Sequence, residues 1–274
     1  MAAFRVAILD MYNNHPGEGM RCIRQLLHRA QVDNNVRFEI DTFNVRANNE
    51  VPDLGYDIYV SSGGPGSPLE SDEAWEPLFF DFVDALFAHN KTSERKKYLL
   101  AICHSFQLIG RHLGVGTVSK RKSTSFGVLP MHLTAAGHAD PVLHALPEPF
   151  YAVDSRDYQL IDLRPERLLE LGVEVLCIEK ERPHVPLPRA VMALRYSPEV
   201  LATQFHPEAD GEGMYRYMLT DERKQQVITA YGEDKYDEMM RLLPDPSTIE
   251  LTESIIVPTF LRNALAGLQE LVLA

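Results

Sequence analysis

The chain has 274 residues, of which 45% are hydrophobic and 24% are charged, and its formal net charge is -12. This composition is that of a globular protein long enough to bury one large core or two modest ones. The 27 lysines and arginines are dispersed, with their densest group at 119–123, which argues against nucleic acids and anionic membranes as partners.

The first half of the chain alternates predicted strands with predicted helices. Short apolar or alternating runs that end in polar residues predict four strands, at 4–12, 37–45, 56–61 and 97–103. Apolar residues spaced three to four apart predict three helices, at 18–31, 73–90 and 105–114. Parallel neighbours need a crossover, and the crossovers here are helical. We therefore expect an α/β fold with a mostly parallel central sheet flanked by helices.

The pattern changes in the second half of the chain. Strand-like runs separated by short polar breaks predict later, partly antiparallel strands of the same sheet, at 127–134, 150–158, 173–181, 190–196 and 200–208. Residues 211–274 are helical in pattern, with a proline-rich break in the middle. We expect one domain at 1–210 and a C-terminal helical extension at 211–274 that packs on it. The sequence does not indicate what the extension does.

The cysteines and the first apolar run indicate the cellular compartment. Cys22, Cys103 and Cys177 are too scattered for a disulfide framework and form no CxxC pair, so we expect a reducing environment and no metal site. The first apolar run is shorter than the about 7 to 15 residues of a secretory signal core. No run reaches the ~18 apolar residues of a membrane helix. A cytoplasmic protein is the expectation.

Cys103 stands where the fourth predicted strand gives way to a helix. Ligands collect at the carboxyl ends of parallel strands, where loops and helix N-termini converge. A thiol on such a turn is held out of the sheet, and the dipoles of the following helix favour its thiolate. Free cysteine is also among the most buried residue types. Cys103 alone therefore does not predict catalysis.

Two other stretches make a nucleophile more plausible. The glycine-rich turn at 61–68 follows the third predicted strand, where bare main-chain N–H groups can point into a cleft. The segment at 202–210 contains His206 and Glu208 on either side of Pro207. Proline favours an extended preceding residue, and residues two apart on an extended segment project to the same side. The pair can thus supply an imidazole base and a carboxylate that orients it.

Taken in order, the stretches SGGPGS, ICHSFQ and QFHPE resemble the class I glutamine amidotransferases, most nearly the glutaminase part of GMP synthases. The resemblance covers residues 4–210. It implies the family's fold, a flavodoxin-like three-layer arrangement, here with a C-terminal helical addition. It also implies a glutaminase-type cysteine hydrolase, which releases ammonia from the glutamine side-chain amide through a thioester on Cys103.

The resemblance assigns a role to each matching position. Cys103 would attack the carboxamide carbon, His206 would relay protons, and Glu208 would orient His206. The main-chain N–H groups of Gly64 and His104 would form the oxyanion hole. The positions implied to bind substrate are Gly66, Ser105, Gln107 and Arg156.

Several positions depart from the family pattern. Ala101 and Ser105 replace the two glycines of GxCxGxQ, and Ser105 would either open the turn or border the pocket. The family's EFG is SFG at 125–127, and its substrate-contacting SHxD is replaced by DSRD at 154–157. Within that stretch, Arg156 could clamp a carboxylate or pair with a nearby acid. Both alternatives stay open at this stage.

Three functions are compatible with these residues. The favoured one is glutamine hydrolysis without a cofactor, in which a small-molecule substrate enters and ammonia leaves. The chain contains neither an SGGVDS-like loop nor a Walker motif, so amination would need a synthase subunit as partner. The same triad could instead cleave a γ-glutamyl amide or peptide. A non-catalytic, glutaminase-like binding subunit is the third possibility.

Overall fold

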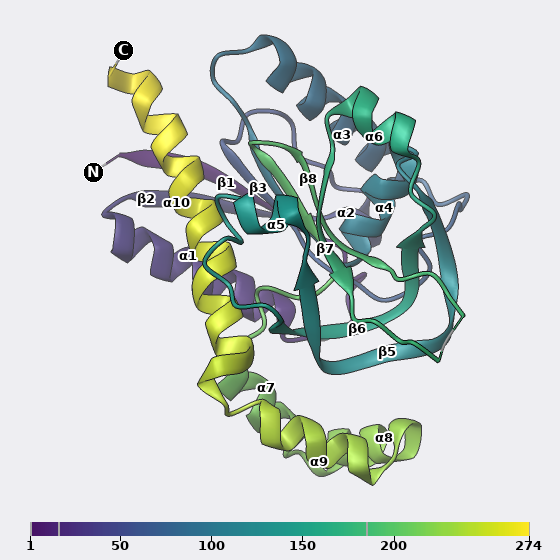
Figure 1. The fold of residues 1–274 in the computed structure, drawn as a ribbon. Coiled ribbons are helices and arrows are strands. Elements are labelled where there is room, and N and C mark those ends of the chain that lie inside the picture. The colour runs from purple at the N-terminus through teal and green to yellow at the C-terminus, as the bar shows by residue number, and fades with distance from the viewer. Residues whose placement is uncertain (1, 16, 185, 274) are drawn as a thin grey trace.

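The structure, a computed structural model, describes residues 2–15, 17–184 and 186–273, with side chains up to residue 270. Within these residues a nine-stranded sheet lies between layers of helices (Figure 1). The strands are β1 (Ala3–Asp10), β2 (Arg37–Asn44), β3 (Ile58–Ser61), β4 (Tyr98–Ile102), β5 (Thr117–Leu133), β6 (Phe150–Ile161), β7 (Glu174–Glu179), β8 (Val191–Ser197) and β9 (Val200–Thr203).

The helices connect these strands and continue beyond them. They are α1 (Gly19–Asn34), α2 (Val45–Asn48), α3 (Trp75–Thr92), α4 (His104–His112), α5 (Ala135–Ala139), α6 (Pro165–Leu171), α7 (Gly211–Met218), α8 (Asp221–Tyr231), α9 (Glu233–Leu242) and α10 (Leu251–Leu273), with a π-type turn, η1 (Pro246–Glu250), before α10. The strands and long helices predicted in the first half of the chain are confirmed. The short helices α2, α5 and α6 were not predicted.

The strand order across the sheet is β2-β1-β3-β4-β9-β8-β7-β5-β6. The part from β2 to β9 is parallel, because helices or long connections carry the chain back between these strands. The pairings from β9 to β6 are antiparallel, as expected for some of the later strands. The order places β4 between β3 and β9, so the ends of these three strands lie side by side.

Helices cover both faces of the sheet, as the three-layer prediction requires. α1 and α10 pack on one face, where Leu27 and Phe260 belong to the same apolar cluster. α3 and α4 pack on the other face, where Phe79 and Phe106 are fully buried. A strand covered on both faces needs apolar residues at consecutive positions, which explains the continuous runs in the sequence.

The antiparallel end of the sheet curls back over the parallel strands. β5 and β6 form a long hairpin (Figure 1), and the main-chain N–H of His206 donates to the carbonyl oxygen of Val153 in β6 at 2.9 Å. β5 begins at Thr117, ten residues before the strand predicted there, because its first half is polar and gives no apolar pattern. The curl brings β6 next to the carboxyl ends of β4 and β9.

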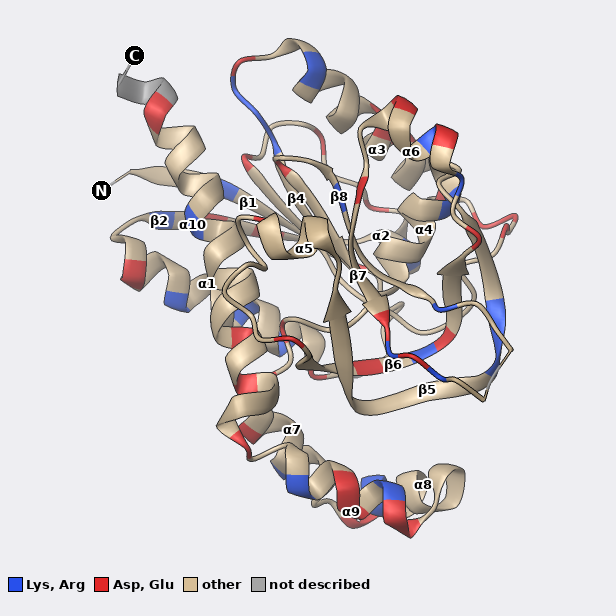
Figure 2. Cartoon of the chain, viewed as in Figure 1, with Lys and Arg blue, Asp and Glu red and all other residues tan. Residues whose placement is uncertain are grey.

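The C-terminal extension has two parts. The helices from α7 to α9 pack on the β5–β6 hairpin through a small cluster that includes Val128, Val153 and Met239. Acidic and basic residues are interspersed along α8 and α9 (Figure 2). α10 then returns across the sheet beside α1. The division of the chain at residue 210 stays a prediction, although α10 shares its core with α1.

The helices also bear on membrane insertion. Among the residues that the structure describes, no helix combines the length and the apolar character needed to span a bilayer.

Phe260 tests how far the stability depends on α10. Its side chain is 2% exposed and lies in the cluster shared with α1. Phe260→Ala leaves a cavity there, and we expect the free energy of unfolding to fall by about 3–5 kcal/mol in urea titrations. The matched control is Asn263→Ala, an exposed position on the same helix, where we expect less than about 0.5 kcal/mol. Equal losses would show that α10 adds nothing to the core.

Candidate active site

Cys103 occupies a sharp turn between β4 and α4. Its backbone has φ 49° and ψ -96°, a positive-φ conformation that costs about 1–3 kcal/mol for a residue with a side chain. The neighbouring elements hold it there: its N–H donates to Thr203 O at 2.7 Å, and its carbonyl oxygen accepts from Gln107 N at 3.1 Å. The thiol therefore lies at the carboxyl end of β4, as predicted from the sequence.

His206 and Glu208 lie at the end of β9, the neighbour of β4. Glu208 is 1% exposed, and its Oε1 lies 2.8 Å from Nδ1 of His206. A Cβ added to Gly63 would lie 2.8 Å from Cε1 of His206 and 3.3 Å from Cβ of Cys103, so imidazole and thiol share one small space. The structure thus brings together the three side chains that the sequence assigned to the triad.

The protonation of His206 follows from this surrounding. Burial alone would lower its pKa, but the Glu208 carboxylate and the sulfur of Cys103 outweigh burial and raise the pKa well above its usual value. An imidazolium is therefore favoured next to the sulfur. Such a pairing activates a cysteine nucleophile.

Gly64 and His104 line a cavity of about 250 Å³ together with Cys103. In the described part of the chain, neither of their main-chain N–H groups donates to another protein group, so both are available as oxyanion donors. A Cβ on Gly64 would collide with the carbonyl oxygen of Met11, so only glycine fits there. The volume lies just below the range of about 300–1,000 Å³ typical of pockets for drug-sized ligands, which suits a small substrate.

The imidazole of His104 has no part in this arrangement. It is 1% exposed, and burial together with the charges of Arg46 and Arg111 lowers its pKa to about 3. The ring is therefore neutral. Only the main chain of His104 faces the cavity in the proposed role.

Gln204 is a site residue that the sequence reasoning missed. Nε2 of Gln107 donates to Tyr158 O at 3.1 Å and to Oε1 of Gln204 at 2.8 Å, and Nε2 of Gln204 lies 3.6 Å from the sulfur of Cys103. A main-chain carbonyl only accepts, so this chain of contacts fixes both amides with an N–H of Gln204 toward the sulfur. Its position two residues before His206, on the same side of an extended segment, was the available signal.

Of the remaining residues expected in the site, two line the cavity and Ser105 does not. Gly66, at φ 99°, and Gln107 line the cavity. Ser105 is not brought to it, because its side chain is fully buried and its hydroxyl donates to Ser62 O at 2.7 Å. The turn at Cys103 directs Ser105 toward the end of β3 instead.

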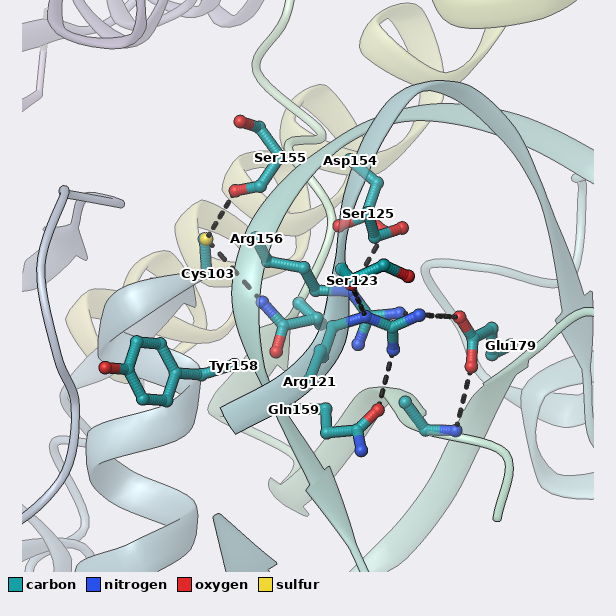
Figure 3. A network of polar contacts seen from close by, with 12 residues as sticks. Cys103, Arg121, Ser123, Ser125, Asp154, Ser155, Arg156, Tyr158, Gln159 and Glu179 are labelled. Carbon is teal, nitrogen blue, oxygen red and sulfur yellow. Dashed lines mark hydrogen bonds and ion pairs between the residues drawn. The ribbon is translucent and has the colours of Figure 1, made fainter. Parts of the chain in front are cut away.

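Arg156 borders the cavity but directs its guanidinium elsewhere. Its Nε lies 2.9 Å from Oδ2 of Asp154, and its Nη2 lies 3.1 Å from Oε1 of Glu179. Figure 3 shows the side chain extending toward Glu179, whereas the carbonyl oxygen of Ser155 faces Cys103, 3.9 Å from its sulfur. Of the two alternatives left open, the structure shows pairing with nearby acids.

The acids around Arg156 form a larger buried network (Figure 3). Arg121 and Arg182 also bind Glu179, with nitrogen–oxygen distances of 3.0 and 2.9 Å. Burial would raise the pKa of Glu179, but the three guanidinium groups outweigh burial and lower it. The network ties β5, β6 and β7 together beside the thiol.

The C-terminal extension contributes to the outer wall of the cavity. Tyr231, at the end of α8, lines it together with Thr124 and Asp157. Its ring stacks on Phe126 with the centroids 4.6 Å apart. Tyr231 is 40% exposed, so this wall faces solvent.

Among the described residues, no group of three or more His, Cys, Asp or Glu side chains is placed to hold a metal ion.

Comparison with known sequences identifies the family. A family model described as "Glutamine amidotransferase class-I" matches residues 20–225. The chain belongs to the class I glutamine amidotransferase family. No curated protein matches it by sequence.

Solved structures show the same fold at low identity. A glutamine amidotransferase from Thermotoga maritima aligns with a TM-score of 0.68 and 14% identity, covering 95% of this chain and 98% of that one. A glutamine amidotransferase from Methylobacillus flagellatus gives 0.67 and 12%, covering 98% and 96%. The glutaminase domain of Trypanosoma brucei CTPS, with bound acivicin, gives 0.56 and 14%, covering 97% and 94%. The expected likeness to GMP synthases in particular stays a prediction.

Glu208→Gln tests the electrostatics of the pair. The variant keeps the shape of the side chain and removes the charge that raises the pKa of His206. In ¹⁵N-edited NMR titrations we expect wild-type His206 to remain protonated well above pH 6.5, and the variant to lose its proton at a lower pH. His132, which lies apart from the site, is the internal reference. Identical His206 midpoints in both proteins would contradict this account.

Proposed function

We propose that this protein hydrolyses the side-chain amide of glutamine to glutamate and ammonia. One observation carries the proposal: the imidazole of His206 lies between a buried carboxylate, Glu208, and the thiol of Cys103 at a strand-to-helix turn. Membership of the class I glutamine amidotransferases supports it.

The proposed reaction has two stages. The sulfur of Cys103, whose proton is held by His206, bonds to the amide carbon, and the amide oxygen becomes an oxyanion facing the N–H groups of Gly64 and His104. His206 then protonates the nitrogen, and the C–N bond breaks to release ammonia. In the second stage water attacks the thioester, gives its proton to His206, and releases glutamate from the regenerated thiol.

The cavity offers groups for the amino-acid end of the substrate. Both N–H groups of the Gln107 amide are used by Tyr158 and Gln204, so its carbonyl oxygen remains as an acceptor toward the cavity. Asp157 provides an exposed carboxylate in the same wall. Two acceptors suit a substrate that carries an ammonium group.

Released ammonia is useful only where a second reaction captures it. We propose a separate synthase subunit as the acceptor, since the chain has neither an SGGVDS-like loop nor a Walker motif. The Trypanosoma brucei neighbour is described as a glutaminase domain of CTPS, which supports such a division of labour.

A γ-glutamyl amide or peptide is the second candidate substrate. The reacting carbon is the same, and the DSRD stretch at 154–157, which replaces the family's SHxD, changes the cavity lining at Ser155, Arg156 and Asp157. Competition between glutamine and γ-glutamyl compounds decides between the two. A preference for glutamine excludes the second candidate.

The central test is ammonia release from glutamine, measured with the protein alone and with a lysate that supplies a partner. Cys103→Ala removes the nucleophile on which the thioester forms, so we expect turnover to be abolished. Cys177→Ala, which alters a buried thiol that does not line the cavity, should retain activity. Absence of ammonia under both conditions, with no labelling of Cys103 by a glutamine-analogue electrophile, would favour a non-catalytic binding subunit.

Tyr231 tests the contribution of the extension. Because Tyr231 lies in the outer wall, away from the thiol, we expect Tyr231→Ala to raise KM for glutamine and to leave kcat nearly unchanged. Leu219→Ala, exposed between α7 and α8, is the control within the same extension. A loss of kcat at constant KM would show that α8 acts on the chemical step.

A further inference from the structure

Three buried serines link the turn at Cys103 to the glycine-rich loop. The hydroxyls of Ser61 and Ser105 are 2.7 Å apart, and the Ser105 hydroxyl donates to Ser62 O at 2.7 Å. The hydroxyl of Ser62 donates to Gly63 O at 2.9 Å and accepts from Met11 N at 3.0 Å. All three serine side chains are fully buried.

The direction of each proton in this set follows from its partners. A carbonyl oxygen has no proton, so Ser105 must donate to Ser62 O. Ser105 has a single hydroxyl proton, and Ser61 must therefore donate to Ser105. By the same argument, Ser62 accepts from the N–H of Met11 and donates to Gly63 O. Every hydroxyl proton in the set is thus assigned without an alternative.

These bonds bear on the orientation of one peptide group. The C=O of Gly63 and the N–H of Gly64 belong to the same trans peptide and point in opposite directions. Ser62 holds the C=O on the side of Met11, which leaves the N–H for the side on which Gly64 lines the cavity with Cys103. A flipped peptide would lose the Ser62 bond and place a carbonyl oxygen in the oxyanion site.

Arg46 secures the next part of the loop. Its guanidinium donates to Met11 O at 3.0 Å and also to Pro65 O. The carbonyl groups of the two residues that flank Gly64 are therefore bound. Gly63 O accepts from Ser62, and Pro65 O accepts from Arg46. The N–H of Gly64 has no protein partner among the described residues, so it is free to donate into the cavity.

We propose that Ser62 and Ser105 are positioning residues, which hold the Gly64 N–H in the donating orientation and fix the loop to the turn that carries Cys103. On this reading the oxyanion hole is formed before substrate binds. Ser105, which departs from the family's glycine, adds the bond between α4 and the end of β3. The inference rests on the proposed function only in taking Cys103 as a nucleophile toward carbonyl groups.

The test compares two reactions of Cys103 in the full-length protein. With p-nitrophenyl acetate, the sulfur, whose proton is held by His206, bonds to the acyl carbon, an oxyanion forms, and p-nitrophenolate leaves with the bonding electrons. With iodoacetamide, the sulfur displaces iodide and no oxyanion forms. The ratio of the acylation rate to the alkylation rate isolates the oxyanion site, and Cys103→Ala gives the background.

We expect Ser62→Ala to lower this ratio by about 10²-fold, the effect of a small misplacement in a catalytic site. Ser105→Ala and Ser105→Gly should lower it by less, because the two bonds that each removes, to Ser62 O and from Ser61, lie further from Gly64 than the Ser62 bond to Gly63 O. A merely structural role would lower the melting temperature and leave the ratio unchanged. The control is Ser197→Ala, which loses a 2.7 Å hydroxyl bond to Glu199 at the opposite end of β9.

Each outcome decides a separate point. Wild-type ratios in folded Ser62→Ala and Ser105→Ala overturn the inference. Should Ser62→Ala fail to fold, Ser105→Ala decides alone, a lowered ratio supporting the inference and a wild-type ratio overturning it. A lowered ratio in a protein that releases no ammonia from glutamine rejects the proposed function and leaves the inference standing.

Discussion

A residue with a side chain is held at φ 49° between β4 and α4, and the other site groups are arranged around it. That conformation persists only because neighbouring main-chain groups restrain it, chiefly Thr203 at the end of β9. β3 on the other side of β4 ends in the glycine-rich turn, and β9 leads directly into His206. The parallel strand order thus assembles the site from three segments that are distant in the chain.

Much of this could be predicted from the sequence because it depends on local patterns. Buried parallel strands and amphipathic helices leave periodic signals, and the rule that ligands gather at carboxyl ends places Cys103, His206 and the glycine turn together. The first half of β5 gave no such signal. It is held by pairing with β6 and by ion pairs such as that of Arg121 with Glu179, a contact between residues far apart in sequence.

The misplaced and missed site residues have a similar origin. Whether Ser105 faces the cavity or the end of β3 depends on the rotation of the first turn of α4, which is set by the backbone at Cys103. Gln204 reaches the sulfur only because Gln107 and Tyr158 orient its amide. Arg156 pairs with Asp154 and Glu179, which lie on the antiparallel strands β6 and β7. Residue types and spacing identify candidates, and side-chain direction then depends on tertiary contacts.

The packing of α10 beside α1 also affects biosynthesis. α1 and its strands leave the ribosome early, whereas the helix that shares their apolar cluster is translated after all of the sheet. At a synthesis rate of about 5–20 residues per second, the apolar face of α1 and its strands stays uncovered for roughly ten to fifty seconds until α10 is translated. During that interval the nascent chain exposes an apolar surface of the kind that chaperones recognise. Slower translation of the last segment would lengthen the exposure.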